Sequence, residues 1–218
     1  MAHDPVTVPA SSASGRRIEV IAAGYSSDPT QLKVLTEALG DPDEYVRASA
    51  LGALARREEL TGTQVIEALK DPAATTRQRA AMLSPQAGGR QSRRQLDEAL
   101  RGMVDDPVPL CVVCALVAIG ARGDRAAVPQ IIALAASHRD PLVIEESVAT
   151  LAALGDPAGL PSVLAATEGK PALRRRAVAA LGAFDGDEVE AALDRLADDR
   201  DWQVRQAVAM LRRGDEDA

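Results

Sequence analysis

The sequence has little of what most folded domains use to fill a thick core. Only four of its 218 residues are aromatic, Tyr25, Tyr45, Phe184 and Trp202, although 46% of the residues are hydrophobic. The apolar mass is therefore alanine, leucine and valine, whose small volumes suit closely spaced helices. Strands would need more isoleucine, threonine and aromatic residues. The composition favours an all-α protein.

Further shortages exclude several classes of protein. The two cysteines, Cys111 and Cys114, are too few for a disulfide framework and fit a reducing cytoplasm. No stretch approaches the roughly 20 apolar residues that span a bilayer, and the first residues lack an apolar segment of signal-peptide length. The net charge of −7 argues against nucleic acid as the main partner. We expect a cytoplasmic protein without a membrane segment.

Catalytic and metal-binding motifs are also missing. The CxxC of Cys111 and Cys114 has neither a second CxxC nor a nearby histidine to complete a zinc site. We therefore expect two buried thiols, with redox sensing as the alternative. There is no glycine-rich phosphate loop and no GxSxG, and Glu145 and Glu146 are adjacent and point to different sides of a helix. We expect no cofactor, no metal and no enzymatic activity.

What the sequence does contain is a repeat. An aspartate-proline pair followed by an apolar helical run begins at Asp41, Asp71, Asp106 and Asp140, with spacings of 30, 35 and 34 residues. Related runs begin near Lys170 and Asp199. Because aspartate is a good N-cap and proline is tolerated at the next position, each pair predicts a helix start. A period of this length is one helical hairpin.

The first helix of each hairpin is expected over residues 30–39, 63–69, 92–103, 127–136, 159–167 and 187–197. Residues 84–92 are predicted to form a longer loop. The proline- and serine-rich residues 1–16 are expected to be a disordered tail, and residues 214–218 a short acidic fray. The repeats between them predict one domain over residues 17–213.

The repeat resembles the short HEAT-like repeats first named for phycobilisome lyase subunits, whose pattern is DPxxxVRxxAxxAL. The best matches lie at Asp41–Leu54, Leu173–Leu181 and Asp199–Val208, while Val112 and Ile144 replace the arginine in two repeats. The resemblance covers about residues 28–213. It implies a right-handed α-solenoid (an alpha-alpha superhelix) of about six helical hairpins, and a concave surface lined by the second helices. It also argues against HEAT-repeat hydroxylases, because the chain has no His-Glu pairs.

Two faces of each second helix follow from helical periodicity. Counting Val46 and its equivalents as zero, offsets +4 and +7 are small and mostly apolar and are predicted to be buried. Offsets +2 and +6 lie opposite and, by the resemblance, line the concave surface. Because +6 carries no charge, we predict a shallow apolar groove centred on Met82, Val113 and Val117. The candidate partner-binding residues are Gln78, Met82, Val113, Val117, Glu145, Ala149, Arg175, Ala179, Gln206 and Met210. The alternative is that the small residues merely reflect an alanine-rich composition.

Three other features have two interpretations each. The arginines at offset +1 (Arg47, Arg77, Arg174 and Arg205) are predicted to pair with turn carboxylates Asp41, Asp71, Asp140 or Asp199 rather than to bind a ligand. The Arg174–Arg176 run is either a ligand patch or a partner of Asp185, Asp187 and Glu188. Trp202 is predicted to cover the last repeat, with an exposed binding anchor as the alternative.

These features favour a non-enzymatic scaffold that binds a protein or peptide partner on the concave face. One alternative is a HEAT-like DNA glycosylase, which would need a basic, aromatic groove and an acid. Another is a chromophore lyase or its chaperone, suggested only by the name of the repeat.

Overall fold

The computed structural model describes residues 12–87 and 93–216, and in these residues it contains thirteen α-helices and no strand. This confirms the all-α solenoid class. The chain divides into two compact units, Met1–Met103 and Val104–Ala218. The single domain expected over residues 17–213 stays a prediction.

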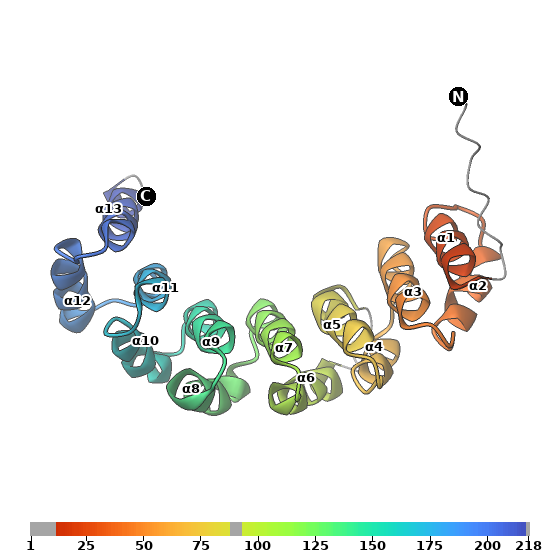
Figure 1. The fold of residues 1–218 in the computed structure, drawn as a ribbon, viewed down its shortest axis with the longest axis horizontal. Coiled ribbons are helices and arrows are strands. Elements are labelled where there is room, and N and C mark those ends of the chain that lie inside the picture. Colours follow the sequence, from red (N-terminus) through yellow and green to blue (C-terminus); the bar gives the residue numbers. More distant parts are fainter. Residues whose placement is uncertain (1–11, 88–92, 217–218) are drawn as a thin grey trace, which may run out of the picture. The chain divides into compact units, whose positions relative to one another are not determined.

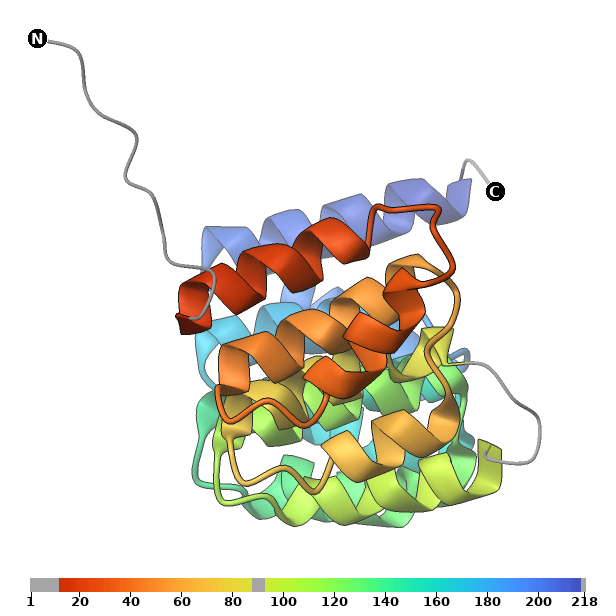
Figure 2. The ribbon, with the colours of Figure 1, turned by 90° about the vertical axis from the view of Figure 1, so that its right-hand side faces the viewer.

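Unit 1 has two layers of helices (Figures 1 and 2). The inner layer consists of α1 (Ala13–Ala23), α3 (Glu44–Arg56) and α5 (Ala74–Leu83), in which α3 packs against both neighbours. The outer layer consists of α2 (Gln31–Ala38), α4 (Gly62–Ala68) and α6 (Arg93–Gly102). A 3-10 turn at Ser84–Gln86 follows α5.

Unit 2 repeats this arrangement. Its inner layer consists of α7 (Pro109–Arg122), α9 (Pro141–Leu154), α11 (Pro171–Leu181) and α13 (Trp202–Glu216), each packed against the next. Its outer layer consists of α8 (Val128–Ser137), α10 (Leu160–Ala166) and α12 (Asp187–Ala197). Short 3-10 turns at Arg125–Ala127 and Pro157–Gly159 lead into α8 and α10. In Figure 1 the inner layer lies on the inside of this unit's bend.

The predicted buried columns are confirmed. At offset +4, Ala50, Ala80, Ala115, Ser147, Ala177 and Val208 are all at most 1% exposed. At offset +7, all but the half-buried Leu211 are buried, and Thr150 is the polar member. Small side chains at these positions let neighbouring helices approach closely, while leucines such as Leu51 and Leu151 fill the space between the layers.

Two helices do not begin at the predicted aspartate-proline pair. Asp140 caps α9 and is followed by Pro141 at the first helical position, as expected. Before α3, however, the cap is Asp43, and at α5 the N-cap position is held by Ala73, which offers no side-chain hydrogen bond. Asp41 and Asp71 instead accept a hydrogen bond from the backbone N–H two residues later, at 2.8 Å in each case. Their second carboxylate oxygen is thereby left for another partner.

The two ends of the domain also need correction. Helix α1 was not predicted, and it begins at Ala13, with Ser12 as its N-cap, so residues 12–16 are not part of a tail. At the other end α13 continues to Glu216, where a fray was expected from residue 214. Residues 1–11 and 217–218 of these two predictions, and residues 88–92 of the predicted loop, lie outside the described part of the chain.

Candidate binding surfaces of the inner helices

Arginine–aspartate pairs join successive inner helices and hold their exposed faces in register. Arg47 Nε and Nη2 donate to the two carboxylate oxygens of Asp71, both at 2.7 Å, and Nη1 donates to the carbonyl of Asp41 at 2.8 Å. Arg174 makes the equivalent pair with Asp199, both bonds at 2.8 Å. This confirms that these arginines are structural, because both hydrogen-bonding edges of each guanidinium are occupied.

One arginine of this pairing, Arg16, was not predicted from the sequence. Arg16 on α1 holds Asp41 in the same bidentate way, at 2.7 and 2.9 Å. Arg77 and Arg205 donate to the carbonyls of Asp71 and Asp199, at 2.9 and 2.6 Å. Asp140, predicted as a partner, caps α9 instead. Arg16, Arg47 and Arg174 each hold the aspartate at the turn before the next inner helix, whereas Arg77 and Arg205 contact the turn before their own helix.

The ion pairs set the protonation of these aspartates. Hydrogen bonds from Arg174 lower the pKa of Asp199 below its usual value, against the opposing effect of burial. At Asp71 burial is the largest influence and would raise the pKa, but the hydrogen bonds from Arg47 and from the Ala73 N–H outweigh it and leave the pKa lowered. Both carboxylates are therefore ionised at neutral pH.

The candidate partner-binding residues are distributed over the two units. Gln78 and Met82 lie on α5 in unit 1, and the other eight lie on the inner helices of unit 2. The surface of each unit is therefore a separate candidate binding surface. A single groove centred on Met82, Val113 and Val117 stays a prediction.

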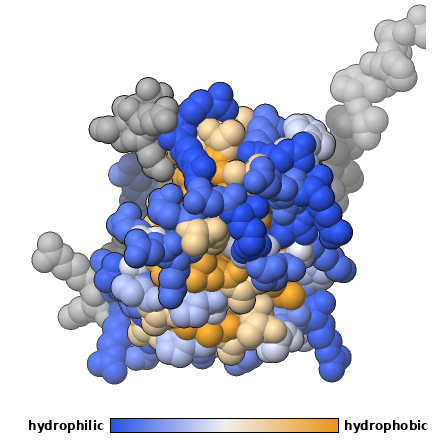
Figure 3. Space-filling view, turned by 90° about the vertical axis from the view of Figure 1, so that its left-hand side faces the viewer, coloured by the Kyte–Doolittle hydropathy of each residue, from blue (hydrophilic) through white to orange (hydrophobic). Residues whose placement is uncertain are grey.

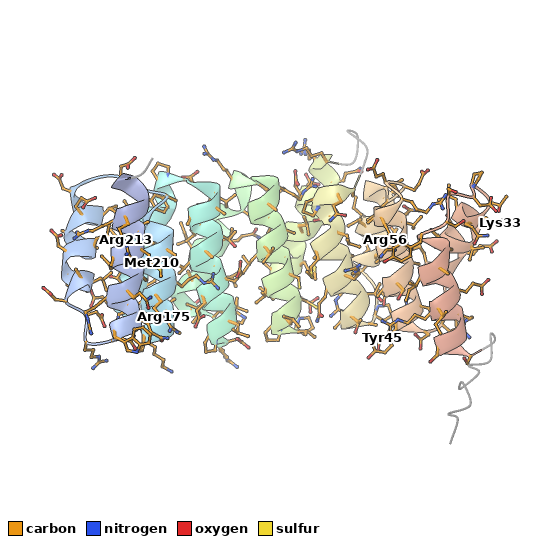
Figure 4. All side chains as sticks on the ribbon, turned by 90° about the horizontal axis from the view of Figure 1, so that it is seen from above. Lys33, Tyr45, Arg56, Arg175, Met210 and Arg213 are labelled. Atoms are coloured by element: carbon orange, nitrogen blue, oxygen red, sulfur yellow. The ribbon has the colours of Figure 1, made fainter. Side chains whose placement is uncertain are left out.

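The unit 2 surface presents an uncharged row. Val117 on α7 is 46% exposed and Met210 on α13 is 56% exposed. Between them Ala149 on α9 is half-buried and Ala179 on α11 is exposed. At offset +2, Val113, Glu145 and Arg175 are half-buried and Gln206 is exposed. Figure 4 looks onto the inner layer and shows Arg175 and Met210 on this side of the unit.

The Arg174–Arg176 run does not form one patch, because its members face three directions. Arg174 is 6% exposed and pairs with Asp199. Arg175 donates to the side chain of Gln203, and Arg176 lies 4.0 Å from Glu146. The predicted partners Asp185, Asp187 and Glu188 are wrong: the partners lie on the neighbouring inner helices. Burial raises the pKa of Glu146, while nearby Arg176 partly counteracts it.

The cysteines are buried, as predicted, and unbonded to each other. Burial raises the pKa of Cys114 to about 11, with smaller contributions from Cys111 and Glu146. No group of three or more metal-ligating side chains occurs among the residues that the structure describes. Trp202 is 61% exposed, which favours the alternative of an exposed side chain over the predicted cover of the last repeat. Figure 3 shows this end of unit 2, where apolar patches lie among hydrophilic side chains.

The unit 1 surface holds a groove of about 470 Å³ on the exposed side of α1, α3 and α5. Sequence reasoning identified only Gln78 and Met82 in it, because α1 was not recognised as a repeat helix. The groove is lined by Arg17, Ile21, Tyr45, Ala48, Ser49, Gly52, Arg56, Thr75, Gln78, Arg79 and Met82.

Aromatic rings orient two arginines of this groove. The Arg17 guanidinium lies 5.7 Å from the centre of the Tyr45 ring, and its Nε donates to Ser49 Oγ at 3.2 Å. The Arg56 guanidinium lies 4.1 Å from the centre of the Tyr25 ring. Both are cation–π contacts, which cover a face of the guanidinium and leave most of its N–H edge open.

A second cavity, of about 790 Å³, lies in unit 2 beside α8. Its lining includes Val104, Leu134, His138 and Asp140. His138 Nδ1 accepts a hydrogen bond from the Asp140 N–H at 3.0 Å, which assigns this histidine to the structure of the turn.

Comparisons with known proteins agree with this architecture. Residues 8–84 match the family model described as HEAT repeats. No curated protein matches the sequence. Among the helices of the described residues, none has the length and apolar character to cross a membrane.

Solved structures of the same fold cover nearly the whole chain. The YibA protein of Escherichia coli is similar with a TM-score of 0.63 and 14% identity, over 96% of this chain and 76% of that one. The CpcE and CpcF complex of phycocyanin lyase from Nostoc sp. PCC7120 gives a TM-score of 0.55 and 19% identity, over 96% of both chains. A designed armadillo repeat protein in complex with the peptide (KR)4 gives 0.53 and 16%, over 88% of this chain and 96% of that one. At such identities the similarity shows the fold alone. The HEAT-repeat model thus matches the N-terminal part of the chain, and the two-layered helices share the fold of the HEAT-like and armadillo-like repeat proteins.

Proposed function

We propose that this protein is a non-enzymatic scaffold that binds a protein or peptide partner along its inner helices. The observation that carries the proposal is the uncharged row of unit 2 on four neighbouring helices, in which Val117, Ala179 and Met210 are exposed and Ala149 is half-buried. A helix face in water usually carries lysine or glutamate at such positions. Leaving apolar side chains exposed there is typical of a surface that another protein covers.

The fold supports this use of the row. Stacked hairpins bury their small residues against each other, so the faces of the inner helices stay free for contact. A solved relative in fold, the designed armadillo repeat protein, is itself in complex with a peptide. In unit 2 the Arg174–Asp199 pair fixes α11 against the turn before α13, and a pre-formed surface loses less conformational entropy on binding.

Site-specific photo-crosslinking tests the proposal. A photoreactive amino acid in place of Val117 or Met210 should form a crosslink to a defined partner protein in the native cell. The matched control places it at Ala133 or Ala165, which are exposed on the outer helices α8 and α10. Equal crosslinking from both layers, or turnover of a substrate by the purified protein alone, would contradict the proposal.

The similarity to the phycocyanin lyase complex keeps a second function open to test. One chain of that CpcE and CpcF structure is similar in fold to this chain over 96% of each. A lyase or lyase-chaperone role would give a new absorbance band after incubation with a bilin and an acceptor protein. The glycosylase alternative finds less support, because no aspartate or glutamate is among the described residues that line the basic groove of unit 1.

A further inference from the structure

The groove of unit 1 differs in charge from the chain that carries it. Three arginines, Arg17, Arg56 and Arg79, line it, and no aspartate or glutamate is among the described residues of its lining. The chain as a whole carries a net charge of −7. In the described part of unit 1, none of these three arginines has an ion pair, whereas Arg16 and Arg47 each hold an aspartate. The groove is thus a local concentration of unneutralised positive charge.

We infer that this groove binds an acidic segment of a partner protein, in which carboxylates flank an apolar side chain. The inference rests on the proposed scaffold function and names the chemistry of one binding site. A carboxylate is the natural occupant, because the tyrosine rings cover a face of Arg17 and Arg56 and leave N–H edges open. Such an edge matches two carboxylate oxygens in geometry and charge.

The third arginine owes its position to a glycine in the middle of α3. A Cβ built on Gly52 would overlap Nη2 of Arg79 and would lie 3.2 Å from its Cζ. The Arg79 guanidinium therefore lies directly over the backbone of α3. Arg79 therefore contributes to the groove lining beside α3, in space left free by a glycine, a residue of low helix propensity.

Apolar side chains lie beside the charges. Met82 is 56% exposed, Tyr45 49% and Ile21 39%. Methionine adapts its shape to varied partners, and tyrosine offers a rigid contact area at low entropic cost. The combination fits a peptide with one apolar residue between acidic ones. It fits nucleic acid less well, because affinity for a long polyanion comes from many phosphate contacts and the chain's overall negative charge opposes them.

The test uses the full-length protein and labelled peptides of alternating glutamate and leucine, glutamine and leucine, or lysine and leucine. Fluorescence anisotropy should show tightest binding to the glutamate peptide, and this preference should fall as salt rises. The triple variant Arg17→Gln, Arg56→Gln, Arg79→Gln should lose about tenfold or more in affinity.

The matched control makes the same change in net charge on the outer layer. Lys33, Lys70 and Arg94 have side chains that are 81%, 65% and 90% exposed, on or directly after outer helices. Figure 4 shows Lys33 at the edge of the unit, away from Tyr45 and Arg56. Their triple change to glutamine should alter the affinity less than twofold. Far-UV circular dichroism of both variants shows whether the helices are retained.

Each other outcome overturns the inference. Equal losses in the two triple variants would mean that only the net charge matters. Equal binding of the glutamate and glutamine peptides would remove the role of carboxylates, and tighter binding of a single-stranded oligonucleotide through the same arginines would replace the peptide by a phosphate backbone. The scaffold proposal is judged separately, since crosslinking from Val117 and Met210 in unit 2 can succeed when the unit 1 groove binds no acidic peptide.

Discussion

The two units share one construction but present different chemistry on their inner faces. In unit 1 that face holds arginines backed by tyrosines, whereas in unit 2 it is a row of valine, alanine and methionine with charges of both signs beside it. The joints between helices differ too. Arg47 joins α3 to the turn before α5, but at the equivalent positions of α7 and α9 the chain has Val112 and Ile144. The packing of a repeat and the character of its exposed face therefore vary independently.

The largest effect is expected from breaking the Arg47–Asp71 ion pair between α3 and the turn before α5. Replacing Arg47 with methionine should lower the free energy of unfolding by about 3 kcal/mol, because Asp71 is left largely buried without its partner. The Asp71 side chain is only 10% exposed. Urea denaturation followed by circular dichroism measures the change. The matched control, Lys70→Met, breaks an exposed pair with Glu67 and should change stability by less than about 0.5 kcal/mol. Equal effects would show that the joint is not structural.

A second prediction separates the packed side of a helix from its exposed side in unit 2. Ala177 is 0% exposed, and leucine there should overpack the contact between inner helices and cost about 2 kcal/mol. Ala179 lies two residues further along α11 and is exposed. Leucine at that position should leave the thermal midpoint nearly unchanged. A large loss from Ala179→Leu would place it in the core and remove it from the binding surface.

The smallest expected effect is the pH dependence of the stability that the Arg47–Asp71 ion pair contributes. Because the pKa of Asp71 is lower in the folded than in the unfolded chain, its stabilising contribution is complete above the unfolded pKa of about 4. It is lost as the pH falls through the lowered folded value. The difference in stability between the wild type and Asp71→Asn should therefore be constant near neutrality and shrink in acid. A difference that grows on acidification would contradict the ionised pair.

Much of the fold could be predicted from the sequence because its signals are local and repeated. The first helices expected over 30–39 and 187–197 appear as Gln31–Ala38 and Asp187–Ala197, since helical periodicity and capping residues set them. The buried alanine column followed from the same periodicity. Helix α1 was missed because it lacks the aspartate-proline start and because a serine-rich segment precedes it. Because α1 supplies Arg17 and Ile21 to the unit 1 groove, the groove could not be predicted without this helix.

The candidate site was harder to predict, because it depends on which side chains meet between helices. Nothing in the sequence distinguishes Arg16, which holds Asp41, from Arg17, which faces the groove. Likewise the partners of Arg175 and Arg176 are Gln203 and Glu146, which lie 28 and 30 positions away in the chain. Pairing across that separation is set by the stacking distance and register of whole helices, which single-sequence patterns do not give.

Two pairs of adjacent arginines, Arg16–Arg17 and Arg56–Arg57, each combine one guanidinium bonded within the fold with one that faces the groove, which makes the chain sensitive to deletions. Consecutive positions on a helix are about 100° apart, so deleting one residue early in α1 or α3 would rotate each such pair by one position. Arg57 would then take the outward-facing position of Arg56, and Glu58 would take the position from which Arg57 donates to the carbonyl of Ser26. Amino-acid replacements on the open face should thus be accepted widely, while single-codon losses within the same helices should be eliminated.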